Sequence, residues 1–269
     1  MDLVDACYAQ DHAAEWDAVG LQVGDPDDQV SNVLVSLDVT AAVLDEAQHR
    51  GADLVVAHHP LLFRPLARLT PETAAGMLAL RAARSHCAVL AVHTNFDAAA
   101  PGTTSPIVEL LGLQEVRPLE PLAVDAAMGL GRIGDLPAEV SLRDVADRLA
   151  GGLPAPHLRV AGPLDRPVRR VAACGGAGDG LMAAAHAAGA DLYVTGDLRH
   201  HVVLDALHLG MTLIDAGHYA TEAAALPALR DRLAAEATGR GLTAGLLASV
   251  TTTEPWSPYC AHHEPKART

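Results

Sequence analysis

A six-residue pattern that occurs twice constrains the fold of this chain more than any other feature. Residues 51–56 read Gly-Ala-Asp-Leu-Val-Val, and residues 189–194 read Gly-Ala-Asp-Leu-Tyr-Val. In both copies a short apolar run follows a glycine, which is typical of a buried strand that begins soon after a helix ends. The repetition indicates two related units within the chain.

The elements expected around each copy also follow the same order. In the first unit we expect strands at 33–37, 54–57 and 88–92 with helices at 40–50 and 71–85 between them. The second unit repeats this order, with strands at 168–174, 192–195 and 212–215 and helices at 180–188 and 200–208. Alternating strands and helices predict parallel β-α-β units with right-handed crossovers. The predicted fold class is therefore α/β, with two related lobes of mainly parallel strands.

The lobes are expected to form one unit over residues 1–254. We predict a first lobe at about 1–117 and a second at 167–254. The segment 118–166 is rich in Pro and Gly, contains one predicted helix near 142–150, and is expected to cross between the lobes. Residues 255–269 contain three prolines among mixed charges, which predicts a loosely attached C-terminal tail.

Composition excludes several classes of protein. Acidic residues outnumber basic ones by 33 to 19 and no Lys or Arg run is present, which argues against a nucleic-acid partner. The first 16 residues lack the pattern of a signal peptide, and no apolar stretch approaches the roughly 20 residues of a membrane span. The four cysteines, Cys7, Cys87, Cys174 and Cys260, form no CxxC pair. A cytoplasmic protein without a membrane partner is expected.

Polar side chains follow the predicted strands of both units. Ligands of open parallel sheets bind beyond the carboxyl ends of the strands, so these positions are candidates for a functional site. The residues are Asp38, His58, His59, His93 and Asp97 in the first half, and Asp197, His200, His201, His218 and Glu222 in the second.

The His58-His59-Pro60 element stops a four-residue apolar run. Two adjacent imidazoles at a strand end point in different directions, so they suit two neighbouring metal ions better than one. The alternative is structural, since such a pair can also cap the strand or face solvent.

Residues 93–97, His-Thr-Asn-Phe-Asp, end the next strand. The Asp97 carboxylate could bridge two cations, and His93 could orient a ligand from outside. An N-cap or Asx-turn is the alternative for Asp97.

His218 and Glu222 lie four residues apart, so they share one face if the segment from Ala220 onward is helical. An ordinary exposed helix pair has the same spacing. Three such clusters at strand ends of one sheet system favour a site for two transition metals, such as Zn, Mn, Fe, Co or Ni, with mixed nitrogen and oxygen ligands.

Two further clusters have open roles. His200 and His201 are candidates for proton transfer or for supporting contacts, as is His93, with a helix-surface position as the alternative. The loop Cys174-Gly-Gly-Ala-Gly178 could present N–H groups to an anion or form a simple tight turn, but it lacks the Lys of a P-loop. The remaining histidines, His12, His49, His86, His157, His186, His208, His262 and His263, are expected at the surface.

Five of these motifs together resemble one known family. The residues 16–24 (Trp-Asp-Ala-Val-Gly-Leu-Gln-Val-Gly), 58–60, 93–97, 196–201 and 215–222 occur in the order of the GTP cyclohydrolase 1 type 2 homologue family, also called the Nif-three-like family. The resemblance extends from about residue 15 to residue 254. It implies that His58, His59, Asp97, His218 and Glu222 bind a dinuclear metal centre in the cleft between the lobes, and that the chain forms a toroidal homohexamer.

The chain departs from the family pattern at two points. Ala18 stands where the family usually has Asn after Trp-Asp. The chain is also too short to contain the additional inserted domain of longer relatives, so functions of that domain are not expected here.

Two function hypotheses follow. In the first, two divalent metal ions serve a hydrolase that acts on GTP-like purine nucleotides or phosphoesters, with His93, His200 or His201 moving protons. In the second, the protein is a non-catalytic hexamer that binds or delivers metal or acts as a regulatory scaffold. A catalytic centre keeps a coordination position open, whereas a structural one is closed.

Overall fold

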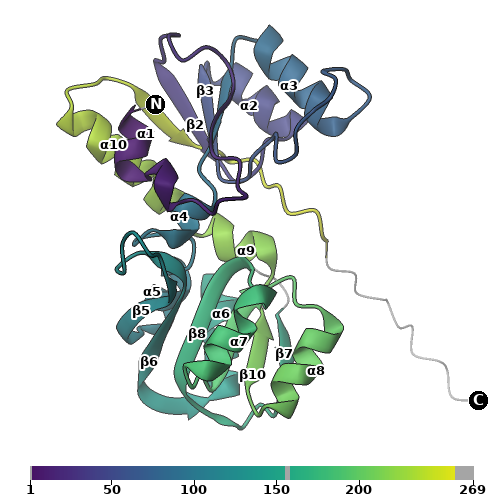
Figure 1. Cartoon of the computed structure of the whole chain (residues 1–269), viewed down its shortest axis with the longest axis vertical. Helices are drawn as coiled ribbons and strands as arrows, with labels where there is room; N and C mark the ends of the chain where they lie inside the picture. Colours follow the sequence, from purple (N-terminus) through teal and green to yellow (C-terminus); the bar gives the residue numbers. More distant parts are fainter. Residues whose placement is uncertain (1, 155–157, 258–269) are drawn as a thin grey trace, which may run out of the picture.

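Two β-sheets with helices packed against them form two lobes, which face each other along the long axis of the molecule (Figure 1). The computed structural model describes residues 2–154 and 158–257. The first sheet has the order β1 (Gly20–Val23), β4 (Ala88–Ala91), β3 (Leu54–Ala57), β2 (Asn32–Ser36), β11 (Gly245–Ala248). The second has the order β5 (Gln114–Pro121), β6 (Gly129–Ser141), β8 (Pro167–Ala177), β9 (Leu192–Gly196), β10 (Thr212–Asp215), β7 (Arg159–Ala161).

The helices connect and cover these strands. Those of the first lobe are α1 (Asp2–Cys7), α2 (Ala41–His49), α3 (Ala74–Arg84) and α10 (Leu226–Gly239). Those of the second lobe are α5 (Ser105–Leu111), α6 (Leu142–Gly152), α7 (Met182–Ala187) and α8 (His200–His208). The short helices α4 (Thr94–Ala98) and α9 (His218–Ala223) lie where the lobes meet (Figure 1). Among the described residues, no helix has the length and apolar character needed to cross a membrane.

The predicted relationship between the lobes is confirmed by the topology. In the first sheet β2, β3 and β4 are parallel neighbours joined through α2 and α3, and β1 pairs antiparallel with β4. In the second sheet β8, β9 and β10 are parallel neighbours joined through α7 and α8, and β7 pairs antiparallel with β10. Each lobe therefore contains the same unit of three parallel strands with one antiparallel neighbour.

The repeated Gly-Ala-Asp sequence makes the same contacts in both lobes. Gly51 and Gly189 have φ angles of 64° and 76°, a left-handed conformation that glycine adopts at helix ends. The Asp53 carboxylate accepts hydrogen bonds of 2.8 and 2.9 Å from the N–H groups of residues 31 and 32. Asp191 accepts bonds of 2.9 and 2.8 Å from the N–H groups of residues 169 and 170. Each Asp thus fixes the preceding strand beside its own.

Several segments belong to a different lobe from the one that the predicted lobe boundaries gave them. The predicted crossover 118–166 contains the end of β5 and all of β6, α6 and β7, which belong to the second lobe. In the opposite direction, α10 and β11 return to the first lobe, where β11 pairs in parallel with β2. Leu229 and Leu233 of α10 are buried in the core of that lobe. These positions are determined by pairing between strands that are distant in sequence, and such pairing cannot be predicted from local periodicity.

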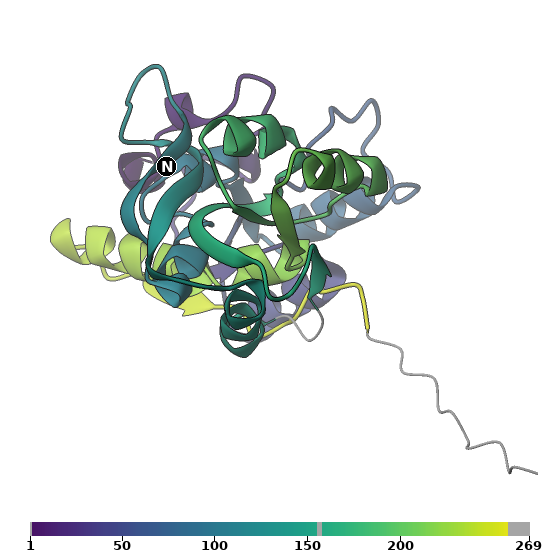
Figure 2. The ribbon, with the colours of Figure 1, turned by 90° about the horizontal axis from the view of Figure 1, so that it is seen from below.

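The segment after β11 leaves the first sheet on the side opposite to α10 (Figure 2). Of the predicted tail, residues 255–257 are described, and residues 258–269 lie outside the described part.

Candidate metal centre

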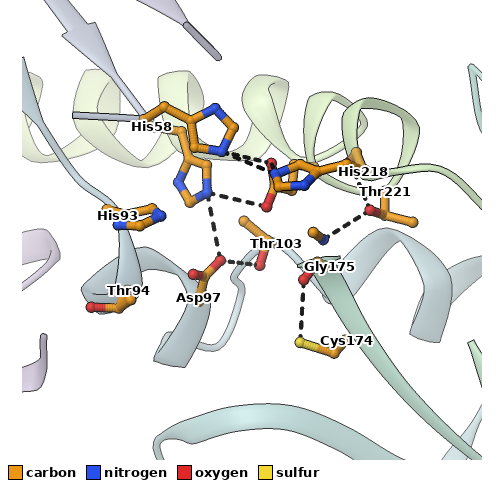
Figure 3. Close-up of polar contacts among 12 residues, drawn as sticks. His58, His93, Thr94, Asp97, Thr103, Cys174, Gly175, His218 and Thr221 are labelled. Atoms are coloured by element: carbon orange, nitrogen blue, oxygen red, sulfur yellow. Dashed lines mark hydrogen bonds and ion pairs between the residues drawn. The ribbon is translucent and has the colours of Figure 1, made fainter. Parts of the chain in front are cut away.

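The five predicted ligands lie together between the lobes. His58 and His59 follow β3, and Asp97 lies on α4, which begins after β4. His218 and Glu222 lie one turn apart on α9, which follows β10 of the second lobe. The carboxyl ends of β3, β4 and β10 therefore bring residues from both halves of the chain to one place (Figure 3).

Their ligand atoms form two overlapping groups that share Glu222, and His58 and His59 form a third possible ligand group with His93. In the inner group Nε2 of His58 lies 3.5 Å from Oε1 of Glu222 and 3.7 Å from Oδ1 of Asp97. In the outer group Nε2 of His59 and Nε2 of His218 each lie 3.1 Å from Oε2 of Glu222. Sequence reasoning favoured Asp97 as the shared carboxylate, whereas the geometry gives that position to Glu222.

The glycine-rich segment 174–178 makes room for Glu222. It is not a separate loop, because residues 174–177 form the irregular end of β8. Gly176 has a φ angle of 65°, and a Cβ atom there would lie 2.0 Å from Oε1 of Glu222. From the sequence, two roles were possible for this segment: an anion site or a tight turn. The structure indicates a third role, since the missing side chain at Gly176 lets the carboxylate enter the site.

Each imidazole in the site is held through its Nδ1 atom by an acceptor outside the site. Nδ1 of His58 donates to the carbonyl oxygen of Val92 at 2.9 Å. Nδ1 of His59 donates to Asp38 at 2.7 Å, and Nδ1 of His218 donates to Asp197 at 2.8 Å. Because these acceptors fix the proton on Nδ1, all three Nε2 lone pairs point into the site.

Two buried atoms of the site have no hydrogen-bond partner among the residues that the structure describes. They are Nε2 of His58 and Oε2 of Glu222. Oε2 of Glu222 forms no hydrogen bond although two imidazole nitrogens lie 3.1 Å away. Buried acceptors are costly when unpaired, and a divalent cation would satisfy them together. The residues present therefore fit a metal, and the mixed imidazole and carboxylate set suits Zn, Mn, Fe, Co or Ni.

The negative charges of the carboxylates in and around the site also favour a bound cation. Burial alone would lower the pKa of His59, but its contacts with the Asp38 and Glu222 carboxylates raise that pKa to about 10. Burial likewise opposes protonation of His218, yet Glu222 and Asp197 raise its pKa to about 9. Burial would raise the pKa of Glu222, but the imidazoles of His58, His218 and His59 hold it well below its ordinary value. Either protons or metal ions must balance the carboxylates here.

His93 lies beside the inner group. Its ring centroid is 5.1 Å from that of His58 and 5.7 Å from that of His59, and its Nδ1 atom donates to Asp17 at 2.8 Å. Burial would raise the pKa of Asp17, but hydrogen bonds from His93 and Thr94 lower it. Sequence reasoning did not single out Asp17 as a site residue; its signal was the Trp16-Asp17 pair in the first motif.

The other two candidates for proton transfer are not brought to the centre. His200 and His201 begin α8 with exposed side chains, and within residues 2–154 and 158–257 neither belongs to a ligand group. The first turn of α8 faces solvent, so a position after a strand end was not sufficient. The predicted surface residues His157, His262 and His263 lie outside the described residues.

A cavity of about 910 Å³ opens beside the outer group. His59 and His218 lie on its wall with their outer carboxylates Asp38 and Asp197. Further wall residues come from β7, α9 and the segment after β11; they include Arg159, Tyr219, Thr253, Glu254 and Trp256. One side of the centre thus faces a space large enough for a small molecule.

The family model described as Duf34/NIF3 (NGG1p interacting factor 3) matches residues 1–255 of the chain. The chain belongs to the Duf34/NIF3 family. A curated relative from Streptomyces coelicolor, named GTP cyclohydrolase 1 type 2 homolog, is 38% identical over 270 aligned positions. The alignment covers 96% of this chain and 92% of that relative.

Solved structures of the family have the same fold. A Bacillus cereus protein related to NIF3 superimposes with a TM-score of 0.91 at 27% identity, over 96% of this Duf34/NIF3 chain and 97% of that one. The Staphylococcus aureus protein SA1388 gives a TM-score of 0.90 at 27% identity, with the same coverage. The α/β fold expected from the sequence is therefore that of the family.

Proposed function

We propose that this Duf34/NIF3 protein binds two divalent metal ions and is a metal-dependent hydrolase. The observation that carries the proposal is the pair of ligand groups that share Glu222, with buried ligand atoms that lack hydrogen-bond partners. His58, Asp97 and Glu222 would hold one ion, and His59, His218 and Glu222 the other. Paired ions of this kind supply an activated water and polarise a carbonyl or phosphoryl oxygen.

The chain itself provides groups for proton transfer. Asp17 holds Nδ1–H of His93, so Nε2 of His93 is free to accept a proton. The Asp17 carboxylate then stabilises the imidazolium that forms. His200 and His201 are not part of this proposal because both side chains are exposed outside the ligand groups.

The substrate would enter from the cavity beside the outer group. Among the described residues of the wall, Arg159 carries the permanent positive charge, and it already pairs with Asp215. Candidate substrates remain GTP-like purine nucleotides and phosphoesters; the name of the curated relatives mentions GTP. With little positive charge on the wall, phosphate binding would depend on the metal ions and on Arg159.

Turnover by metal-reconstituted protein tests the hydrolase proposal. GTP, other nucleotides and phosphomonoesters should be assayed with Zn, Mn, Fe, Co and Ni, and Glu222→Gln serves as the control variant. We expect turnover of one substrate class that disappears in the control. If no metal form turns over any compound faster than Glu222→Gln, the hydrolase proposal is wrong.

The acidic cavity wall favours a second candidate, a metal-binding or metal-delivery protein. Asp38, Asp197 and Glu254 all line the cavity beside the outer group, and such carboxylates attract cations. Delivery predicts that zinc moves from this protein to an acceptor chelator faster than it dissociates spontaneously from the protein. A homohexamer remains a prediction that rests on the family resemblance, and light scattering tests it. A cytoplasmic location remains a prediction from the sequence.

A further inference from the structure

The two ligand groups are held in different ways. His58 in the inner group is fully buried, and its Nδ1 atom is fixed by the backbone at Val92. Asp97 accepts a hydrogen bond of 2.6 Å from Thr103, whose side chain is buried. The outer group instead relies on side chains near the surface, since His59 and His218 are 25% and 33% exposed.

The segment that follows β11 reaches this outer group. Ser249 and Thr251 donate hydrogen bonds of 2.6 and 2.7 Å to the Glu46 carboxylate of the first lobe. Thr252 bonds at 3.1 Å to the hydroxyl of Tyr219, the residue next to His218. The hydroxyl of Thr253 donates to Oδ2 of Asp38. The segment is thus tied to both lobes as it passes the cavity.

The Asp38 carboxylate connects Thr253 to a ligand. Its Oδ2 atom accepts from Thr253, while its Oδ1 atom accepts from Nδ1 of His59 at 2.7 Å. A carboxylate held at one oxygen has fewer orientations, so it presents the other oxygen to the imidazole in one direction. The direction of Nε2 of His59 toward Glu222 then follows from the position of Thr253.

We propose that Thr253 is a positioning residue of the metal centre that acts through Asp38 on His59 and therefore on the outer group alone. This inference rests on the proposed binding of two metal ions. The inner group has its own supporting threonine, Thr103, and within the described part of the chain no direct hydrogen bond joins its ligands to Thr253. Removal of the Thr253 hydroxyl should weaken one of two metal sites and leave the other unchanged.

Zinc binding by three variants tests the proposal. Thr253→Val removes the hydroxyl with little change of shape, and Thr253→Ser keeps it. Thr251→Val is the matched control in the same segment, since Thr251 bonds to Glu46 and not to Asp38. Competition with a chromophoric chelator gives the two dissociation constants of each protein. Loss of supporting contacts of this kind commonly costs about 10- to 100-fold in metal affinity.

We expect one dissociation constant of Thr253→Val to rise by about 10- to 100-fold, with both constants near wild type in Thr253→Ser and Thr251→Val. Anomalous diffraction from zinc-loaded Thr253→Val crystals should show reduced occupancy at His59 and His218 only. Unchanged constants, equal loss at both sites, or equal loss in Thr251→Val would each overturn the inference. Wild-type protein that binds no zinc would instead contradict the proposed function itself.

Discussion

Nε2 of His59 and Nε2 of His218 face each other at 3.2 Å, although the two residues are 159 positions apart and belong to opposite lobes. Each ring donates its Nδ1 proton outward, to Asp38 or Asp197. Two lone pairs at this distance repel each other unless a positive charge lies between or beside them. A proton or a metal ion at this point therefore helps to hold the lobes together.

Gly176→Ala should displace Glu222 and weaken both metal sites. The added Cβ atom would lie 2.0 Å from Oε1 of Glu222, so the carboxylate must move. The φ angle of 65° adds a backbone cost of about 1–2 kcal/mol for a residue other than glycine.

Gly210→Ala is the matched control for this prediction. Gly210 has a φ angle of 81°, and a Cβ atom there meets no atom within 4 Å. It should carry a similar backbone cost without loss of metal affinity. Calorimetric metal titration separates the two effects; equal metal affinity in the two variants would show that Gly176 has no role at Glu222.

The stability of the metal-free protein should fall as pH rises from about 6.5 to 10. The pKa of His59 is raised from 6.5 to about 10 and that of His218 to about 9. A raised pKa means that the stabilising charge is fully present below pH 6.5 and is lost as pH passes through 9 and 10. Urea unfolding in the presence of a chelator measures this trend, and a flat midpoint over the range would contradict it.

Metal binding should show the opposite dependence on pH. Metal ions bind neutral imidazoles, so protons must leave His59 and His218 before the outer group is complete. Apparent affinity is therefore expected to rise over the range in which metal-free stability falls. Titrations in buffers of different ionisation enthalpy should detect released protons; the absence of proton release would rule out this competition.

The fold could be predicted in its central part because that part is local. Each strand of β2, β3 and β4 is a short apolar run, and Gly51 and Asp53 mark the helix end and the strand start that the sequence repeats at 189–191. The return of α10 and β11 to the first lobe could not be predicted. This return depends on the pairing of β11 with β2, which is distant in sequence. The residues of β11 alone do not indicate which strand they pair with.

The candidate site was predictable to the level of residue type and strand end. His58 follows a strand of the first sheet, whereas His218 and Glu222 follow a strand of the second. The sequence predicted one sheet system, but these residues come together because the two lobes meet at the carboxyl ends of both strands. The same argument made His200 a candidate for the site, but the structure gives it the helix-surface alternative, with an exposed side chain in the first turn of α8. The sequence did not indicate Asp17 and Thr253 as site residues. Each contacts the site through another side chain, and residue spacing does not predict such contacts.

Glu46→Gln should release the segment 249–251 and destabilise the protein by about 1–2 kcal/mol. Glu46 accepts hydrogen bonds from Ser249, Thr251 and the N–H group of Val250. Burial would raise its pKa, but these bonds lower it from 4.5 to about 2. The contribution is therefore present above pH 4.5 and is lost as pH falls toward 2.

Hydrogen exchange at residues 249–251 and urea unfolding at pH 7 and pH 3 test this prediction. Glu236→Gln is the control, because Glu236 pairs with Arg240 on an exposed helix face and should matter by less than about 0.5 kcal/mol. Equal effects of the two substitutions would refute a special role for Glu46.

Asp53→Asn and Asp191→Asn should destabilise the protein by similar amounts, about 1–3 kcal/mol each, because both carboxylates accept two backbone N–H bonds in equivalent places. The two changes lie in different lobes and should add in the double variant. Denaturant unfolding measures all three. A large loss of stability from one substitution with none from the other would contradict the structural equivalence of the two repeats.

Metal content tests the central claim most directly. Elemental analysis of purified, metal-loaded protein should give two divalent ions per chain for wild type and for His49→Ala, whose exposed imidazole bonds to the carbonyl oxygen of Asp45 in its own helix. His58→Ala should lose the inner ion, and Glu222→Gln, which changes the carboxylate shared by both groups, should retain at most one ion. Equal metal content in wild type, His58→Ala and Glu222→Gln would contradict the assignment of this site.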